Sequence, residues 1–251
     1  MKSNKAGNIK GRTFDIYFIV VAFILLQFAC CIYDDVSRAM IYAEMNAAAT
    51  RGRDIHVSIT NANEKRKVSL LPPIWPKTRL VSTNIPDEIS GKVFKTSTEY
   101  FATLYDEEHV GTQTWKPWIQ NFDYSKLAGA GVPAKEGKGK LLAKNNMWLI
   151  AANITEEDSD LIPVLITRNV DVKAIEHAIN CGITSTNFDT KIDIGNGDYK
   201  TPFGKKAIVL VRKGGGVHKY TQKYSTMRVL FNGQELPPRD PSKQPIVYLL
   251  P

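Results

Sequence analysis

Oxygen-bearing side chains gather in one glycine-containing stretch, DTKIDIGNGDYK, at residues 189–200. Its candidate ligands are Asp189, Asp193, Asn196 and Asp198. Calcium is bound by several oxygen ligands, which one flexible loop can supply. The spacing differs from that of an EF-hand, and turns rich in Asn, Gly and Asp are also common without any metal. The stretch is therefore a candidate calcium loop, with an ordinary turn as the alternative.

Other groups of reactive residues have simpler explanations. Residues 106–109 (DEEH) carry metal-capable groups, but consecutive side chains cannot all reach one ion, and the end of a helix explains them. Lys213 beside Gly214–Gly216 lacks the following helix of a phosphate loop, so a hairpin turn is expected there. The cysteines and histidines lack the spacing of a zinc site or a catalytic motif. We therefore predict that the chain is not an enzyme and holds no cofactor apart from the candidate calcium.

The one long apolar run, Ile16–Tyr33, is the element that decides how the chain is organised. Its 18 residues contain a single strongly polar side chain, Gln27, and would cover about 27 Å as a helix, close to the ~30 Å of a bilayer core. A cleaved secretion signal has a shorter apolar region of about 7–15 residues and ends in a small-x-small site, which this run lacks. A lipid-modified Cys30 after Ala29 is a second alternative. The sequence predicts a retained transmembrane segment at residues 13–35.

Charges on either side of the run predict its orientation. Residues 1–12 contain four basic side chains and no acid, whereas Asp34–Asp35 follow the run. The net charge is +8, and without these four the chain has 29 basic and 25 acidic residues, or +4. This pattern favours a basic cytoplasmic leader at residues 1–12 and an exported remainder, and it argues against nucleic acid as a partner.

The helix is expected to continue beyond the apolar run. No proline occurs between Phe14 and Leu71, and Ala and Met are frequent. A line of residues at 3–4 spacing predicts an exported amphipathic half at residues 36–62 that packs on the rest of the chain, with the helix ending near Asn61. Its members are Val36, Met40, Ala43, Ala47, Thr50, Asp54 and Ser58, with Ala39, Ile55 and Ile59 beside it.

Residues 63–251 are expected to form an exported α+β head. Prolines 72, 73 and 76 end the helical pattern. Thr96 and Glu99 have the spacing of a capping box at the start of a short helix, and AKNNMWLIAANI (143–154) is predicted to be another helix. LIPVLITRNV (161–170) indicates a strand, DVKAIEHAINCG (171–182) a helix between Asp171 and Gly182, and residues 205–224 a hairpin. The fold class predicted is α+β: a long N-terminal helix, with a transmembrane and an amphipathic half, packed on an antiparallel sheet with small inserted helices.

The start KGRTFDIYFIVVAFILLQ resembles the "GFTLIELLVVIAIIAIL" start of type IV pilins and type II secretion pseudopilins. The stretches NNMWLIAANITEEDSDLIPVLITRNVD and FGKKAIVLVRKGGGVHKY are similar to a divergent set of pseudopilin-like proteins from Verrucomicrobia- and Lentisphaerae-type bacteria. The resemblance implies a non-enzymatic subunit of a type II secretion pseudopilus or type IV pilus-like filament. Such a subunit sits in the bacterial inner membrane, with its N-terminus cytoplasmic and its head periplasmic or, in a filament, extracellular.

The resemblance also implies site residues and partners. A prepilin peptidase would cut after Gly11, ahead of Arg12 and Phe14. Asp15 is the acid nearest to the family's assembly glutamate, which neutralises the amino terminus of a neighbouring subunit; the alternative is a carboxylate at the helix start. Major pseudopilins hold calcium in a loop of their C-terminal sheet. Expected partners are the membrane, copies of itself or sibling pseudopilins, and the secretion or pilus assembly machinery.

A second interpretation of the whole chain remains open. It is a stand-alone single-pass membrane protein whose exported domain binds a ligand or a partner.

Overall fold

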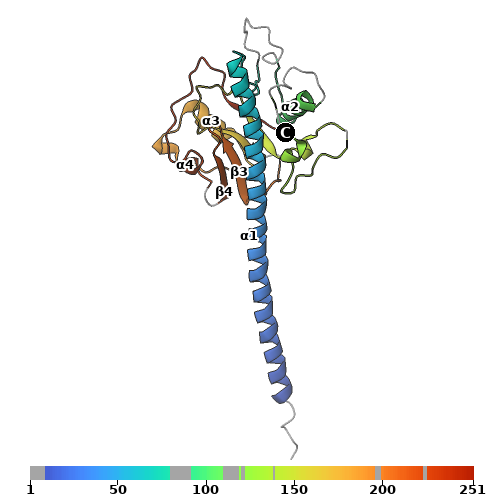
Figure 1. Cartoon of the computed structure of the whole chain (residues 1–251). Coiled ribbons are helices and arrows are strands. Elements are labelled where there is room, and N and C mark those ends of the chain that lie inside the picture. Colours follow the sequence, from blue (N-terminus) through green and yellow to red (C-terminus); the bar gives the residue numbers. More distant parts are fainter. Residues whose placement is uncertain are drawn as a thin grey trace, which may run out of the picture. The chain divides into compact units, whose positions relative to one another are not determined.

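A computed structural model describes residues 9–79, 92–109, 119, 122–137, 139–195, 199–222 and 225–251. Within these ranges, the side chains of residues 9–17, 28–31, 34 and 107–109 are not described. The chain divides into an N-terminal unit, residues 1–43, and a head unit, residues 44–251. Helix α1 (Ile9–Val68) contributes to both units, and each unit is described by itself (Figure 1).

Helix α1 is one uninterrupted helix of 60 residues. The predicted continuity is confirmed, but the helix ends at Val68 and not near Asn61, because no proline or glycine interrupts residues 62–68. Beyond it, Leu70 adopts a positive φ of 56° and the Leu71 N–H donates to Arg66 O at 3.0 Å, which satisfies a terminal carbonyl group. Pro72, Pro73 and Pro76 follow, and they prevent the helix from continuing.

The predicted transmembrane half of α1 is wrong. Over the residues that the structure describes, none of the helices is both long and apolar enough to cross a membrane.

The head unit is built on a five-stranded antiparallel sheet, as predicted. Its strand order is β4-β3-β2-β1-β5. The strands are β1 (Trp148–Ala152), β2 (Pro163–Thr167), β3 (Ala207–Arg212), β4 (Val217–Thr221) and β5 (Val247–Leu249). Register is set by pairs such as Leu149↔Ile166 and Leu210↔His218. Strands β1, β2 and β3 are buried on both faces, which explains their continuous apolar runs.

The part of α1 in the head unit packs on this sheet, beside β3 in Figure 1. The face of the helix that makes this contact differs from the predicted face. The buried line is Met45, Ala48, Gly52, Ile55, Ile59, Ala62 and Arg66. The predicted line is instead exposed from Val36 through Asp54, and only Ser58 is buried. Ile55 and Ile59, expected beside the predicted line, are central to the real contact. Both lines have 3–4 spacing, so spacing alone could not choose between them.

Gly52 marks the closest approach of α1 to the sheet. A Cβ atom added there would lie 2.7 Å from Trp148 Cη2 and 2.9 Å from Val211 Cγ2. Trp148 is fully buried, and its indole N–H donates to Lys126 O at 3.0 Å. Glycine at position 52 therefore lets the ring of a β1 residue reach the helix backbone.

Short helices surround the sheet. They are α2 (Ser97–His109), α3 (Lys173–Cys181), α4 (Met227–Leu230) and the 3-10 turns η1 (Tyr124–Leu127), η2 (Ala143–Asn145) and η3 (Ser185–Asn187). The predicted capping box of α2 is only half formed: the Glu99 N–H donates to Thr96 Oγ1 at 3.0 Å, but the N–H that donates to Glu99 Oε2, at 3.1 Å, is that of Lys95, one residue before the cap. The predicted helix at residues 143–154 is wrong, because only Ala143–Asn145 form a 3-10 turn before β1 begins.

Side chains bond to the backbone of one sheet edge, and a charged side chain lies on the other. Along β5, the Tyr248 N–H donates to Glu176 Oε1 at 2.6 Å, and Asn180 exchanges two bonds with the backbone of Ile246. Along β4, Lys219 Nζ donates to Asn46 Oδ1 of α1 at 2.5 Å. Helix α3 thus borders one edge, and a charged side chain lies on the other.

Candidate functional site

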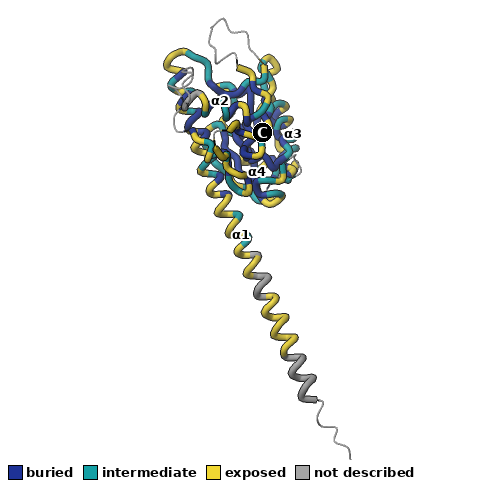
Figure 2. The backbone as a smooth tube through the Cα atoms, turned by 90° about the vertical axis from the view of Figure 1, so that its right-hand side faces the viewer, coloured by how far each residue is buried: buried dark blue, intermediate teal, exposed yellow. Residues whose placement is uncertain are grey.

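The most extensive unpartnered surface of the N-terminal unit is apolar. The side chains from Phe18 to Leu26 are exposed, with fractions from 48% at Ile24 to 70% at Phe18 among the large ones. Farther along the same unit, Tyr33, Val36 and Met40 are 73%, 52% and 61% exposed. Figure 2 draws nearly all described residues of α1 in this unit as exposed. Apolar patches of this extent are typical of interaction surfaces.

Part of this surface follows a regular line. Successive members are three or four positions apart, except for Leu26 and Tyr33, which are seven apart. Its described members are Ile19, Ala22, Leu26, Tyr33, Val36, Met40 and Ala43. This is the spacing at which one helix meets another in a coiled coil. The line contains Ala22 and Ala43, whose small side chains permit close approach of a second helix.

The residues predicted for processing and assembly all lie in α1. Gly11, Arg12, Phe14 and Asp15 belong to its first two turns. Their side chains are outside the described residues, so the roles of these four residues stay predictions.

The candidate calcium residues are described only in part. Asp189 is exposed, and its Oδ1 lies 3.5 Å from Arg228 Nε. Asp193 accepts a hydrogen bond through its backbone carbonyl from the Asp171 N–H at 3.0 Å. Asn196 and Asp198 lie outside the described residues. Where side chains are described, no three His, Cys, Asp or Glu groups come together as a metal site. Calcium binding by the whole loop stays a prediction.

The acidic end of α2 lies beside an aromatic pair. Asp106 is exposed, and the side chains of residues 107–109 are outside the described set. Tyr105 and Tyr124 stack with ring centroids 3.9 Å apart. Burial, with the charge of Asp106 as a smaller contribution, raises the pKa of Tyr124. This arrangement keeps the phenol neutral and joins α2 to η1.

The glycines beside Lys213 form the predicted hairpin turn between β3 and β4. Lys213 Nζ donates to Glu156 O at 2.8 Å, to Asp158 O at 2.6 Å and to Asp160 Oδ1 at 3.3 Å. The ammonium group is therefore engaged in holding the 156–160 loop and is not directed at a phosphate.

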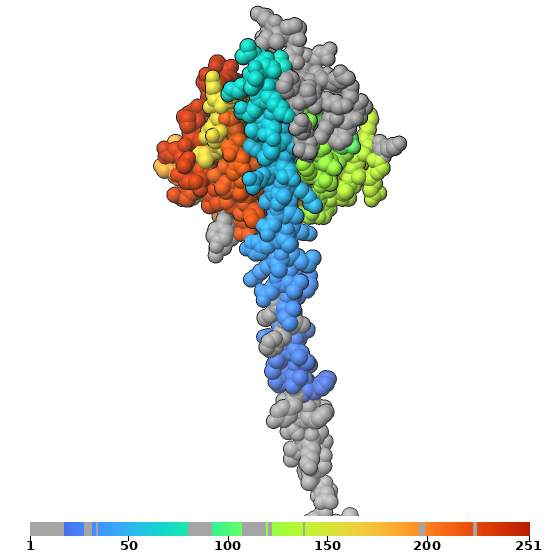
Figure 3. All heavy atoms as spheres, in the orientation of Figure 1, coloured from blue at the N-terminus to red at the C-terminus, as the bar shows by residue number. Residues whose placement is uncertain are grey.

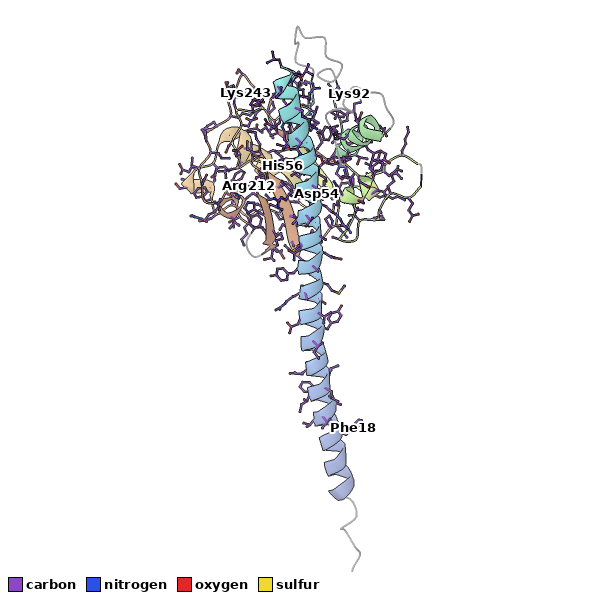
Figure 4. All side chains as sticks on the ribbon, viewed as in Figure 1. Phe18, Asp54, His56, Lys92, Arg212 and Lys243 are labelled. Atoms are coloured by element: carbon purple, nitrogen blue, oxygen red, sulfur yellow. The ribbon has the colours of Figure 1, made fainter. Side chains whose placement is uncertain are left out.

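His56 lines a cleft of about 410 Å³ where α1, Trp75 and this hairpin meet. Its imidazole is buried and its Nε2 lies 2.8 Å from Lys213 O (Figure 4). Burial lowers the pKa of His56, although the bond to Lys213 opposes this shift. Glu64, Lys67, Glu156 and Asp160 also line the cleft, and Lys67 pairs with Glu156 at 3.1 Å. These contacts bind the hairpin to α1.

Two features were not predicted correctly from the sequence. Cys181 Sγ lies 3.5 Å from His177 Nδ1 on α3, a pairing that the i, i+4 spacing could have indicated. The second feature is the exposed line on the outer face of α1 in the head unit. The sequence predicts that this line packs on the rest of the chain, because its members have the 3–4 spacing of a buried face, but the line is exposed from Val36 through Asp54.

Comparison with known protein families, with characterised proteins and with solved structures found no match.

Proposed function

We propose that this chain is a structural, non-enzymatic subunit of a pseudopilus or pilus-like filament. It assembles by packing the N-terminal unit of α1 against the same helix of further copies or of sibling subunits. The observation that carries the proposal is the set of exposed apolar side chains described in that unit, Phe18–Leu26 together with Tyr33, Val36 and Met40. Such a surface is costly in water, and packing against other helices removes it from solvent.

The spacing of the surface supports a helix as its occupant. The described residues of its 3–4 line, which ends with Val36, Met40 and Ala43, lie on one side of α1. A partner with the same spacing buries this line completely, because knobs from each helix fill holes on the other. Copies of the chain carry that spacing by definition.

The head supports the same role. Its antiparallel sheet packs against residues 44–68 of α1 through a line that includes Gly52 and Ile55. The described side chains of α1 in the N-terminal unit have no such packing partner within that unit. The resemblance of the chain's start to pilins and pseudopilins points the same way. It also suggests a prepilin peptidase and the secretion or pilus assembly machinery as partners.

Replacing two residues of the seam tests the proposal. In the Val36→Lys/Met40→Lys variant, the lysines place charge in the contact, so we expect the oligomers of the full chain in detergent to disappear in cross-linking and sedimentation. The matched control is Asp35→Lys/Tyr42→Lys, at two exposed positions of the same helix that lie off the seam. A wild-type chain that stays monomeric, or a seam variant that assembles like the control, would contradict the proposal.

A further inference from the structure

The outward face of α3 carries a thiol beside an imidazole. Cys181 and His177 lie about one helical turn apart, and both side chains are exposed. Cys181 Sγ lies 3.5 Å from His177 Nδ1. Residues four apart on a helix share one face, so α3 alone brings these two groups together. The pair is therefore accessible to a ligand from solvent.

The distance between the two atoms suits a metal ion. Zinc binds thiolate sulfur at about 2.3 Å and imidazole nitrogen at about 2.0–2.1 Å, usually in tetrahedral geometry. Two such ligand atoms on one ion are about 3.5–3.6 Å apart. The separation of Sγ and Nδ1, 3.5 Å, agrees with that value. An ion can therefore replace the proton between the two groups with little movement of either atom.

Hydrogen bonds to residues 246–248 hold α3 in place. Asn180 Nδ2 donates to Ile246 O at 2.8 Å, and the Ile246 N–H donates to Asn180 Oδ1 at 2.9 Å. The Tyr248 N–H donates to Glu176 Oε1 at 2.6 Å. These two side chains are the sequence neighbours of the thiol and the imidazole. The two groups thus come from one anchored helix, which reduces the entropy lost when an ion binds them.

The end of α3 also favours positive charge. Cys181 is the last residue of the helix, and His177 lies in its final turns. The carbonyl groups at the C-terminal end of a helix carry partial negative charge, which stabilises a cation there. The position of the pair on α3 therefore adds to its attraction for a metal ion.

The chemistry of the two groups selects the class of metal. Thiolate and imidazole suit Zn²⁺ and related transition metals, whereas Ca²⁺ and Mg²⁺ take oxygen ligands. Where side chains are described, no third His, Cys, Asp or Glu joins the pair. Water would thus complete the coordination. A chelate of two residues differs from the four-ligand structural zinc sites whose spacing the sequence lacks.

The pair lies apart from the packing of α1 on the sheet. Figure 3 shows the part of α1 in the head unit, in light blue and cyan, across the visible face of the head, and Figures 1 and 2 both label α3 away from it. An ion bound at α3 therefore leaves that packing unchanged.

We propose that His177 and Cys181 form a two-residue chelating site for a divalent cation of the zinc class. On binding, the thiol proton of Cys181 passes to solvent. Sγ and Nδ1 each donate an electron pair to the ion, and His177 keeps its proton on Nε2. The site gives the head a metal-binding activity that does not depend on assembly of the chain.

Cobalt tests the site, because a Co²⁺–thiolate bond gives a charge-transfer absorption in the near ultraviolet. The experiment uses the full chain in detergent with Cys30→Ser and Cys31→Ser, so that Cys181 is the remaining thiol, kept reduced with a phosphine. Titration with Co²⁺ should produce the absorption, and Zn²⁺ should remove it by displacing Co²⁺. In the same chain, His177→Gln removes one of the two ligands and should weaken Co²⁺ binding roughly tenfold or more.

Two controls test the spacing. Lys173→His added to His177→Gln keeps the number of histidines but places the imidazole eight residues from Cys181, about 12 Å along the helix, so it should not restore binding. His218→Gln removes a histidine of β4 and should bind Co²⁺ like the parent chain. Circular dichroism checks that every variant keeps its helix content.

Three results would overturn the site. They are the absence of the cobalt absorption in the parent chain, an unchanged titration in His177→Gln, and an absorption that Zn²⁺ does not remove. None of them depends on whether the chain forms oligomers. A monomeric chain that binds Co²⁺ through both residues would overturn the proposed function and leave the metal site standing.

Discussion

Individual polar side chains hold the loops of the head to its sheet. Arg168 is buried, and its guanidinium donates to the carbonyl groups of Ala143, Asn146 and Thr201 at 2.6–2.9 Å. Arg239 forms a buried ion pair with Asp158. Burial opposes ionisation of Asp158, but the hydrogen bond from Arg239, with smaller contributions from Thr155, outweighs it and keeps the pKa of this carboxyl below its usual value. Planar guanidinium groups suit these multiple bonds, so lysine is a poor substitute at both positions.

His56 makes the stability of the head depend on pH. Burial lowers its pKa below 6.5, so the unfolded chain binds the proton more strongly than the folded chain does. The stability that neutral His56 contributes is fully present above pH 6.5 and is lost as the pH falls from 6.5 through the lower folded-state pKa. We expect the free energy of unfolding in urea to decrease between about pH 7.5 and pH 5.5.

The His56→Gln variant tests whether His56 causes this pH dependence of the free energy of unfolding. Glutamine keeps a donor for Lys213 O but does not titrate, so the pH slope should become shallower. It should not vanish, because burial and Arg212 also lower the pKa of His218. An unchanged slope in His56→Gln would show that His56 is not responsible.

At the scale of elements, the crossing of α1 over β1 determines how closely the helix packs. Gly52→Ala adds a methyl group where Trp148 and Val211 leave no room. Overpacking costs about 1–3 kcal/mol, against a gain of up to about 1 kcal/mol from the better helix propensity of alanine. We expect a net loss of stability of about 1 kcal/mol in urea unfolding.

Gly139→Ala provides the matched control for this prediction. An added Cβ at Gly139 meets no atom within 4 Å, so the same chemical change should leave stability nearly unchanged. Equal effects of the two substitutions would mean that α1 does not pack on Trp148 as described.

Helices α1, α2 and α3 and the β3–β4 hairpin could be predicted from the sequence, because residue spacing, helix caps and turn residues mark them locally. The 3-10 turn and strand at 143–152 could not, because a fully buried apolar run such as Trp148–Ala152 has no polar face whose period distinguishes a strand from a helix. The face of α1 was also misassigned, since Trp148 and Val211, which select the Gly52 side, come from far along the chain.

The candidate sites were less predictable than the elements. The hairpin turn at Gly214–Gly216 follows from local residue types, and so it was found. The engagement of Lys213 with the 156–160 loop, and of His56 with Lys213, depends on three segments that meet only in the folded head. Sequence spacing carries no signal for such contacts.

For the molecule as a whole, processing of the leader is the clearest biochemical prediction. If the chain is a pilin-like subunit, co-expression with a prepilin peptidase should remove residues 1–11, which mass spectrometry of the intact chain detects. Gly11→Val should block the cut and leave the full mass. A wild-type chain that keeps Met1 in the presence of the active peptidase would contradict this prediction.

The side chains along the two sheet edges have a consequence for how the head behaves at high concentration. Many identical heads waiting at high local concentration would risk joining strand to strand and growing into irregular aggregates. Glu176 and Asn180 already bond to the backbone of β5, and Lys219 places a charge on β4. The edges of the head therefore resist strand-to-strand joining between copies, so we expect concentrated protein to stay free of β-sheet aggregates.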